Sequence, residues 1–215
     1  MTEIFEDIQP PELKFSAILP CCGFGTRVNM PANQSKELLL NPATNQPLIQ
    51  WHIDLCQKYE IEPIFIIRPA KTDLIEYVKD IGTTVLYEPK ENEEWMFTIY
   101  NNREHFGVKN ILMLPDTTFE PADLTELKLQ LEWLELVSLT HEVSEPTKWG
   151  TITDSYIYEK QDWGNNTAWG VLGFDISIVH IFEDLGKYKQ TDISKFVKHQ
   201  LPLINFKDHT RNGKA

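Results

Sequence analysis

Two glycines, Gly23 and Gly25, follow the first apolar run of the chain with one residue between them. Glycine has no side chain, so the backbone N–H groups of such a turn can approach a polyphosphate closely. Arg27 and Lys36 follow and carry the positive charge that complements phosphate oxygens. A bare G-x-G pattern occurs in many turns, and neither the dinucleotide fingerprint GxGxxG nor the Walker pattern is present. The glycines alone are therefore a weak indication of a phosphate site.

An acidic residue closes another apolar run. Asp116 comes directly after Pro115 and the run 110–114, which predicts a buried strand. One carboxylate is sufficient as a first protein ligand for Mg²⁺, because this ion takes its other ligands largely from water and phosphate oxygens. An isolated aspartate after a strand can equally start a turn or cap a helix. Its position alone does not decide between these roles.

Strands and helices alternate along the first half of the chain. Apolar runs predict strands over 15–19, 63–67, 84–87 and 110–114, and helical spacing predicts helices over 47–59, 72–80 and 95–106. Thr72 is expected to cap the second helix. After residue 139 the pattern changes to short strands over 150–152, 156–158 and 170–174. We therefore predict an α/β fold, with a Rossmann-like, mostly parallel sheet, helices on both faces, and ligands outside the carboxyl ends of the strands.

The size and composition fit one globular domain. The chain has 215 residues, of which 41% are hydrophobic and 24% are charged, and this is enough to bury a continuous core. We expect a flexible tail over 1–13 and a single domain over 14–215. Whether the domain is truncated at its C-terminal end is left open.

The charge and hydropathy of the chain exclude some classes of partner. The net charge is −12 with no basic block, so nucleic-acid binding is not expected. No run of 18 apolar residues is present and the first residues are acidic, so we expect a cytoplasmic protein that does not enter a membrane. The three cysteines, Cys21, Cys22 and Cys56, are interpreted as reduced, buried thiols, because two of them are adjacent and the number is odd.

Several segments together are more specific than the glycines. Leu19-Pro20-Cys21-Cys22-Gly23-Phe24-Gly25-Thr26-Arg27 is followed by Ser35-Lys36-Glu37-Leu38-Leu39 and by Pro47-Leu48-Ile49-Gln50. This series resembles the signature of the sugar nucleotidyltransferases (nucleoside-diphosphate-sugar pyrophosphorylases), which reads L-A-A-G-x-G-T-R, then P/S-K-x-L-L, then K-P-L-I. Within that family the glucose-1-phosphate thymidylyl- and uridylyltransferases look most similar. The resemblance implies the nucleotide-diphospho-sugar transferase fold, which is GT-A-like.

The resemblance also implies roles for individual residues. The nucleotide would contact Leu19, Cys21, Cys22, Gly23, Gly25, Thr26, Glu88 and Pro89, and Asp116 would hold Mg²⁺. Arg27, Lys36 and Lys160 would be the catalytic cations. Trp149-Gly150-Thr151-Ile152 and Glu159-Lys160 look like the family's Y-G-V-V and E-K-P elements, so Gly150, Glu159 and Lys160 would bind the sugar phosphate. Taken alone, Lys160 would be interpreted as a solvated surface lysine.

Two departures from the family pattern leave alternatives open. The base-reading segment Q-P-x-P-x-G-L-A has Glu88 in place of glutamine, and an ionised carboxylate only accepts hydrogen bonds, which favours a guanine or cytosine nucleotide. The later W-x-D-x-G element, which carries the second metal aspartate, is not found. Either it lies beyond the given end, or Asp208 substitutes for it, or the protein binds nucleotide without turnover.

The expected activity is transfer of a nucleotidyl group from a nucleoside triphosphate to a sugar 1-phosphate, with release of pyrophosphate. The expected partners are these two substrates, and a homo-oligomer is left open. The alternatives are a catalytically silent nucleotide sensor and a cytidylyltransferase acting on a non-sugar alcohol phosphate. A glycosyltransferase is less favoured, because Asp116-Thr117-Thr118 does not form its D-x-D motif.

Overall fold

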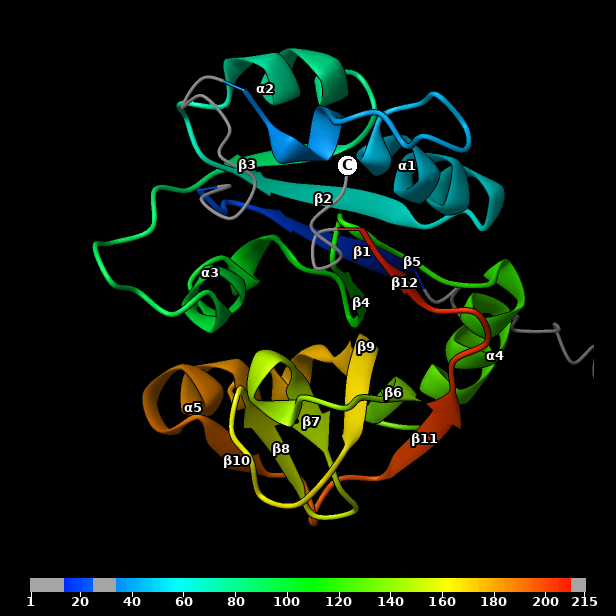
Figure 1. Ribbon diagram of the computed structural model, residues 1–215, viewed down its shortest axis with the longest axis vertical. Coiled ribbons are helices and arrows are strands. Elements are labelled where there is room, and N and C mark those ends of the chain that lie inside the picture. The colour runs from blue at the N-terminus through cyan, green and yellow to red at the C-terminus, as the bar shows by residue number, and fades with distance from the viewer. Residues whose placement is uncertain (1–13, 25–33, 210–215) are drawn as a thin grey trace, which may run out of the picture.

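Four parallel strands form one half of the central sheet. The computed structural model describes residues 14–24 and 34–209. The parallel strands lie in the order β4-β1-β2-β3, and their bounds are Phe15–Cys21 (β1), Glu62–Ile67 (β2), Thr83–Leu86 (β3) and Lys109–Met113 (β4). Their carboxyl ends share one edge, where the chain turns into Cys22-Gly23 after β1 and into Pro115-Asp116 after β4 (Figure 1).

The other half of the sheet is mainly antiparallel. Strand β9 pairs antiparallel with β4, β6 and β7, and β8 extends the sheet from β7 to β10. The bounds are Leu136–Glu142 (β6), Gly150–Ile152 (β7), Tyr156–Glu159 (β8), Thr167–Asp175 (β9), Gln190–Asp192 (β10) and Lys198–Pro202 (β11). Strand β11 runs parallel to β6, and a separate small sheet joins β5 (Thr117–Thr118) to β12 (Lys207–Asp208). The predicted parallel core is thus confirmed within a mixed sheet.

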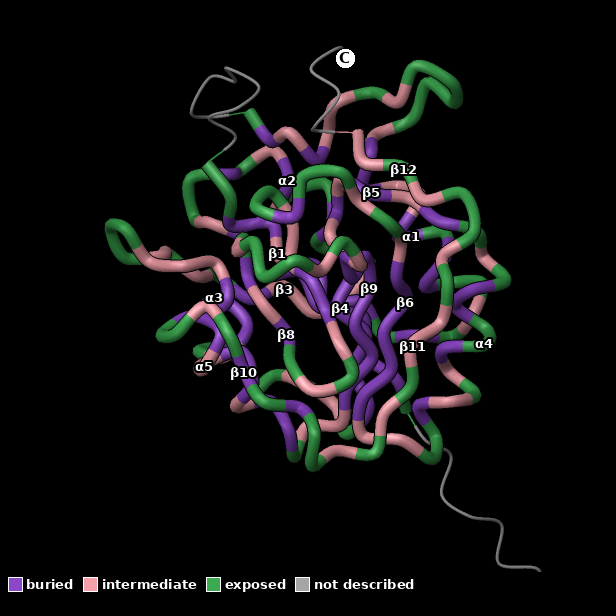
Figure 2. Tube along the Cα trace, turned by 60° about the horizontal axis from the view of Figure 1, so that its bottom comes forward, coloured by how far each residue is buried: buried purple, intermediate pink, exposed green. Residues whose placement is uncertain are grey.

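Helices cover both faces of the sheet, as predicted. Alternation along β1 directs Ala17 and Leu19 to one face and Ile18 to the other, because successive strand side chains point to opposite sides. One face is covered by α1 (Leu48–Lys58), α2 (Thr72–Val78) and α4 (Pro121–Leu131), and the other by α3 (Met96–Tyr100) and α5 (Ile181–Tyr188). The strands between these layers are largely buried in Figure 2. The resulting rigid sheet holds the loops at its carboxyl edge.

Two predicted helices differ in detail. The helix predicted over 95–106 is the short α3 followed by a 3₁₀ turn, Arg103–His105, because Asn101 and Asn102 interrupt it. Thr72 is the first residue of α2 and not its cap: Lys71 occupies the N-cap position and makes no side-chain capping bond. The helices α4 and α5 and the strand β6 were not predicted from the sequence.

Three further expectations concern the chain as a whole. Cys21, Cys22 and Cys56 are buried and unbridged, which agrees with the prediction of reduced thiols. Among the described residues, no helix combines the length and the apolar character needed to cross a membrane. The tail predicted over 1–13 lies outside the described residues.

Candidate functional site

A cavity of about 390 Å³ opens at the carboxyl edge of the parallel strands. Its walls come from segments far apart in the sequence: the turn after β1, the 3₁₀ turn Lys36–Leu38, the turn after β4, and the β7–β8 hairpin. The cavity is lined by eight site residues predicted from the sequence, namely Cys22, Gly23, Lys36, Pro89, Asp116, Gly150, Glu159 and Lys160. Residues from both predicted sets, for the nucleotide and for the sugar phosphate, therefore meet in one space.

The turn after β1 presents backbone to this cavity. Gly23 is exposed, and a Cβ built there would meet only Lys36 Cε, at 3.9 Å, among the described atoms. Cys22 is buried and its thiol donates to the carbonyl oxygen of Ile66, with Sγ 3.2 Å from that oxygen. The cysteine thus packs against β2 and leaves the space in front of Gly23 open. Gly25, Thr26 and Arg27 lie outside the described residues.

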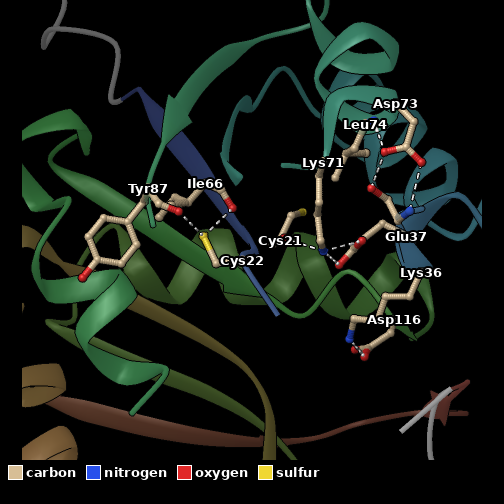
Figure 3. A network of polar contacts seen from close by, with 11 residues as sticks. Cys21, Cys22, Lys36, Glu37, Ile66, Lys71, Asp73, Leu74, Tyr87 and Asp116 are labelled. Carbon is tan, nitrogen blue, oxygen red and sulfur yellow. Dashed lines mark hydrogen bonds and ion pairs between the residues drawn. The ribbon is translucent and has the colours of Figure 1, made fainter. Parts of the chain in front are cut away.

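Lys36 and Asp116, which both line the cavity, form an ion pair. Lys36 Nζ lies 2.7 Å from Asp116 Oδ2. Burial, the largest single effect, would lower the pKa of Lys36, but the Asp116 and Glu37 carboxylates together outweigh it and the pKa is raised. Burial would likewise raise the pKa of Asp116, but the Lys36 ammonium, together with a backbone hydrogen bond, outweighs it and the pKa is lowered. Both groups are therefore charged near neutral pH, beside each other at the base of the cavity (Figure 3).

His52 of α1 is fully buried near Asp116. Burial lowers its pKa to about 4, and the Asp116 carboxylate only partly opposes this effect. Between about pH 6.5 and pH 4 the imidazole is neutral in the folded chain but protonated in the unfolded chain. The free energy of unfolding therefore falls as the pH drops through this interval. Over that interval the loss is expected to be about 3 kcal/mol in the free energy of unfolding.

This pH dependence is a testable prediction. In His52→Leu the decrease in unfolding free energy between pH 6.5 and pH 4 is expected to be smaller than in the wild type, because the titrating group is gone. Urea unfolding at a series of pH values measures it. The control is His199→Gln, which changes an exposed histidine and should retain the wild-type dependence. An equal pH dependence in His52→Leu and wild type would contradict the prediction.

The opposite wall of the cavity carries a buried carboxylate. Glu159 ends β8 and is only 2% exposed. Its Oε1 lies 2.9 Å from Lys160 Nζ and accepts a 2.9 Å hydrogen bond from the indole N–H of Trp95. Lys160 itself is exposed, with a backbone φ of 53° that turns the chain sharply after the strand. The bond to Trp95 and the pairing with Lys160 fix the glutamate and keep the lysine at the cavity rim.

Gly150 faces this carboxylate across the hairpin. The register pairs Gly150 with Glu159. A Cβ at position 150 would lie 2.2 Å from Trp169 Nε1, so no larger residue fits without moving a buried indole. The glycine is required by close packing, and its backbone borders the cavity between Trp149 and Trp169.

Asp208 brings a further carboxylate to the cavity. Strand β12 pairs antiparallel with β5, so Asp208 lies opposite Thr117, and the His209 amide donates to the Asp116 carbonyl oxygen at 3.0 Å. Asp208 lines the same cavity as Asp116. The sequence left open whether Asp208 substitutes for the second metal aspartate, and the structure has Asp208 in the lining of this cavity.

Three predicted nucleotide contacts lie away from the cavity. Leu19 and Cys21 are fully buried in the core beneath the turn. The Glu88 carboxylate accepts from Arg68 Nε at 3.0 Å, and Glu88 is not among the residues that line the cavity, whereas its neighbour Pro89 is. Arg68 also stacks on Phe24, with its guanidinium carbon 3.8 Å from the ring centre.

Several cavity residues had no assigned role from the sequence. Trp95, Thr98 and Trp169 line the cavity, together with Trp149, which the sequence placed only within the Y-G-V-V-like segment. Tryptophans at such positions are indistinguishable in sequence from ordinary core residues, because both are apolar and flanked by strand or helix patterns. The packing of α3 and the pairing of β7 with β8 and β9 bring these residues to one space.

Comparison with known proteins identifies the fold. No protein-family model matches the sequence, and neither does any curated protein. A Bacillus anthracis structure assigned as a glucose-1-phosphate thymidylyltransferase, in complex with sucrose, matches with a TM-score of 0.67 and 14% identity over 91% of this chain and 90% of its own. A ligand-free UDP-glucose pyrophosphorylase matches with a TM-score of 0.67 and 16% identity, over 94% and 95% of the two chains.

A UDP-glucose pyrophosphorylase in complex with UDP-glucose matches with a TM-score of 0.65 and 17% identity, also over 94% and 95% of the two chains. The chain has the sugar nucleotidyltransferase fold. The matches cover nine-tenths or more of each chain, so this fold includes both the parallel half and the antiparallel half of the sheet. The cavity lies at the carboxyl edge, where open α/β sheets bind their ligands.

Proposed function

We propose that this protein transfers a nucleotidyl group from a nucleoside triphosphate to a sugar 1-phosphate, giving a nucleotide sugar and pyrophosphate. One observation supports this most: the glycine turn, the Lys36–Asp116 pair and the Gly150–Glu159 hairpin line one cavity of about 390 Å³. That volume lies within the usual range for small-molecule sites. The sugar nucleotidyltransferase fold of the structural neighbours agrees with the proposal.

On the nucleotide side, the open backbone at Gly23 would contact the triphosphate and Lys36 would neutralise part of its charge. Lys36 is held 2.7 Å from Asp116, so its ammonium is already positioned beside the expected phosphates. Arg27 would add a second cation; this role rests on the sequence motif alone. Leu19 and Cys21 would act through the backbone shape of β1, because their side chains are buried.

On the sugar side, Lys160 would pair with the phosphate of the incoming sugar 1-phosphate. Glu159 would accept hydrogen bonds from sugar hydroxyls through its oxygens, with Oε1 already engaged by Trp95. The backbone at Gly150 would border the sugar ring, and the tryptophan rings nearby offer flat apolar surface to its C–H groups.

A magnesium ion fits the donor set of the cavity. Mg²⁺ usually binds through one or two carboxylates plus phosphate oxygens and water. Asp116 and Asp208 would be those carboxylates. Within residues 14–24 and 34–209, no group of three or more His, Cys, Asp or Glu side chains is placed to hold a metal ion. When bound, the ion would neutralise charge on the triphosphate and so favour attack on it.

The chemistry requires positioning more than a reactive side chain. The phosphate oxygen of the sugar 1-phosphate attacks the α-phosphorus of the triphosphate in line, and pyrophosphate leaves from the opposite side. The lysines on the two walls, Lys36 and Lys160, would hold the leaving and attacking groups and counter the charge that develops between them. No nucleophilic serine or cysteine is needed: the cysteine that lines the cavity, Cys22, has a pKa raised by burial to about 12.

Pyrophosphate release tests the proposed reaction. The purified protein is incubated with Mg²⁺, each of the four ribonucleoside triphosphates or dTTP, and a panel of sugar 1-phosphates and non-sugar alcohol phosphates. We expect release only when a triphosphate and a sugar 1-phosphate are present together. Nucleotide binding without turnover would favour the silent sensor, and turnover with alcohol phosphates alone would favour the other alternative. A preference for UTP or dTTP would argue against the guanine or cytosine preference that was expected from the sequence.

A substitution at Gly23 distinguishes an effect on triphosphate binding from an effect on folding. In Gly23→Ala the added methyl meets only the flexible Lys36 side chain, so the free energy of unfolding is expected to change by less than about 0.5 kcal/mol. The same methyl occupies the approach of the triphosphate, and we expect its Kd to rise about tenfold or more. Calorimetric titration and urea unfolding measure the two quantities. Unchanged affinity in the stable variant would exclude the turn as the phosphate site.

A further inference from the structure

A buried ion pair lies just behind the cavity and does not line it. Lys71 is 4% exposed and Glu37 is fully buried. Lys71 Nζ lies 3.0 and 2.9 Å from the two carboxylate oxygens of Glu37 and donates to the backbone carbonyl of Cys21 at 2.7 Å. The three protons of the ammonium therefore have three acceptors within hydrogen-bond distance (Figure 3).

This lysine joins three segments of the chain. It belongs to the turn between β2 and α2, Glu37 belongs to the 3₁₀ turn Lys36–Leu38, and Cys21 ends β1. The two residues after Cys21 are Cys22 and Gly23, which line the cavity. One side chain thus connects the start of the glycine turn to the segment that carries Lys36.

The segment around Lys36 is also bonded to the first turn of α2. The Asp73 carboxylate accepts from the Ser35 amide at 2.9 Å and from the Ser35 hydroxyl at 2.7 Å. Ser35 and Glu37 flank Lys36: Ser35 is the extended N-cap residue of the 3₁₀ turn and Glu37 lies within the turn. Holding both flanking residues on the α2 side therefore directs Lys36 toward Asp116.

Fold stability alone does not require a charged pair here. Removing two charges from water is unfavourable, and apolar residues of similar volume commonly stabilise a core as well or better. What an ion pair adds is a defined geometry between its partners. We infer that Lys71 and Glu37 are positioning residues, which set the placement of Lys36 and of the glycine turn for the triphosphate. This inference rests on the proposed function.

A paired replacement tests the inference. Glu37→Met with Lys71→Met removes both charges together, so neither is left buried alone. The expected result is a folded protein in which kcat/KM for the triphosphate falls at least tenfold, whereas KM for the second substrate changes less than twofold. In the absence of nucleotide, the Leu38 and Leu39 amides, which donate to the Ser35 and Lys36 carbonyls, should exchange at least tenfold faster.

A similar ion pair at the amino-terminal end of β4 is the control. Lys109 lies 3.1 Å from Asp175 and donates to the Leu134 carbonyl at 3.2 Å, so it too joins a carboxylate and a backbone oxygen. Lys109→Met with Asp175→Asn should leave the kinetics and the exchange of Leu38 and Leu39 within twofold of wild type. If the first double variant does not fold, Asp73→Ala provides a second test, because it removes the hydrogen bonds to Ser35 without leaving a buried charge unpaired. It is expected to make hydrogen exchange at the Leu38 and Leu39 amides at least threefold faster.

The outcomes separate the inference from the proposed function. A wild type that binds no triphosphate refutes both. A wild type that turns over, together with a folded variant of equal kcat/KM and equal amide protection, refutes the inference alone. Loss of kcat/KM together with faster exchange at Leu38 and Leu39, absent from the control, is the result that the inference predicts.

Discussion

Asp116→Asn is expected to lower kcat by about 100- to 1,000-fold while the protein stays folded. The substitution keeps an oxygen that can accept from Lys36, so the local packing is preserved. It removes the negative charge that would hold Mg²⁺ beside the phosphates, and the loss of one electrostatic contact at a reacting phosphate typically costs this much in rate. Pyrophosphate release under saturating substrates measures it.

The control for Asp116 uses the Lys109–Asp175 ion pair at the first residue of β4. Asp175 lies 3.1 Å from Lys109, beyond the end of β4 that is remote from the cavity. Asp175→Asn is expected to retain kcat within twofold. Asp208→Asn should give an intermediate loss, because Asp208 is the second carboxylate that we propose. A wild-type kcat in Asp116→Asn would remove the basis for a metal at this position.

Lys36→Met is the second substitution with a large expected effect. We expect kcat/KM for the triphosphate to fall by about 100-fold or more, because we propose the ammonium as a phosphate contact and because it is the partner of a buried carboxylate. A conservative Lys36→Arg should recover part of the loss, since the charge is kept but the planar guanidinium does not reproduce a point charge. Initial rates at varied triphosphate concentration give the values.

An exposed lysine provides the comparison for Lys36. Lys58 ends α1 and lies over the ring of Tyr59, away from the cavity. Lys58→Met makes the same chemical change and is expected to leave kcat/KM within twofold. Similar kinetics in Lys36→Met, Lys58→Met and wild type would mean that the cation in the cavity has no part in binding the triphosphate.

The parallel half of the fold was predictable because its signals are local. Buried parallel strands appear as continuous apolar runs, and β1 and β4 each end where a glycine turn or an aspartate follows. The site residues on this half, Gly23 and Asp116, follow directly from that pattern. The antiparallel half was only outlined. Strands β7 and β8 have three and four residues, too few to show a clear periodicity, and polar Ser138 and Thr140 interrupt the apolar pattern of β6.

Parts of the candidate site depend on tertiary pairing that no motif carries. Asp208 reaches the cavity through the pairing of β12 with β5, about 90 residues earlier in the chain. Lys71 and Glu37 look in sequence like two solvated surface residues, since charged side chains are seldom buried unless they are paired. Glu88 was predicted as a base contact, yet the structure has it bonded to Arg68, a partner 20 residues away that only the β2–β3 pairing brings near.

A crystal structure of the protein with a non-hydrolysable nucleoside triphosphate and Mg²⁺ tests the central claim most directly. The account predicts the polyphosphate against the backbone at Gly23, Lys36 in contact with it, and the ion on Asp116, with Asp208 as its neighbour. A triphosphate bound elsewhere, with this cavity empty, would contradict the account.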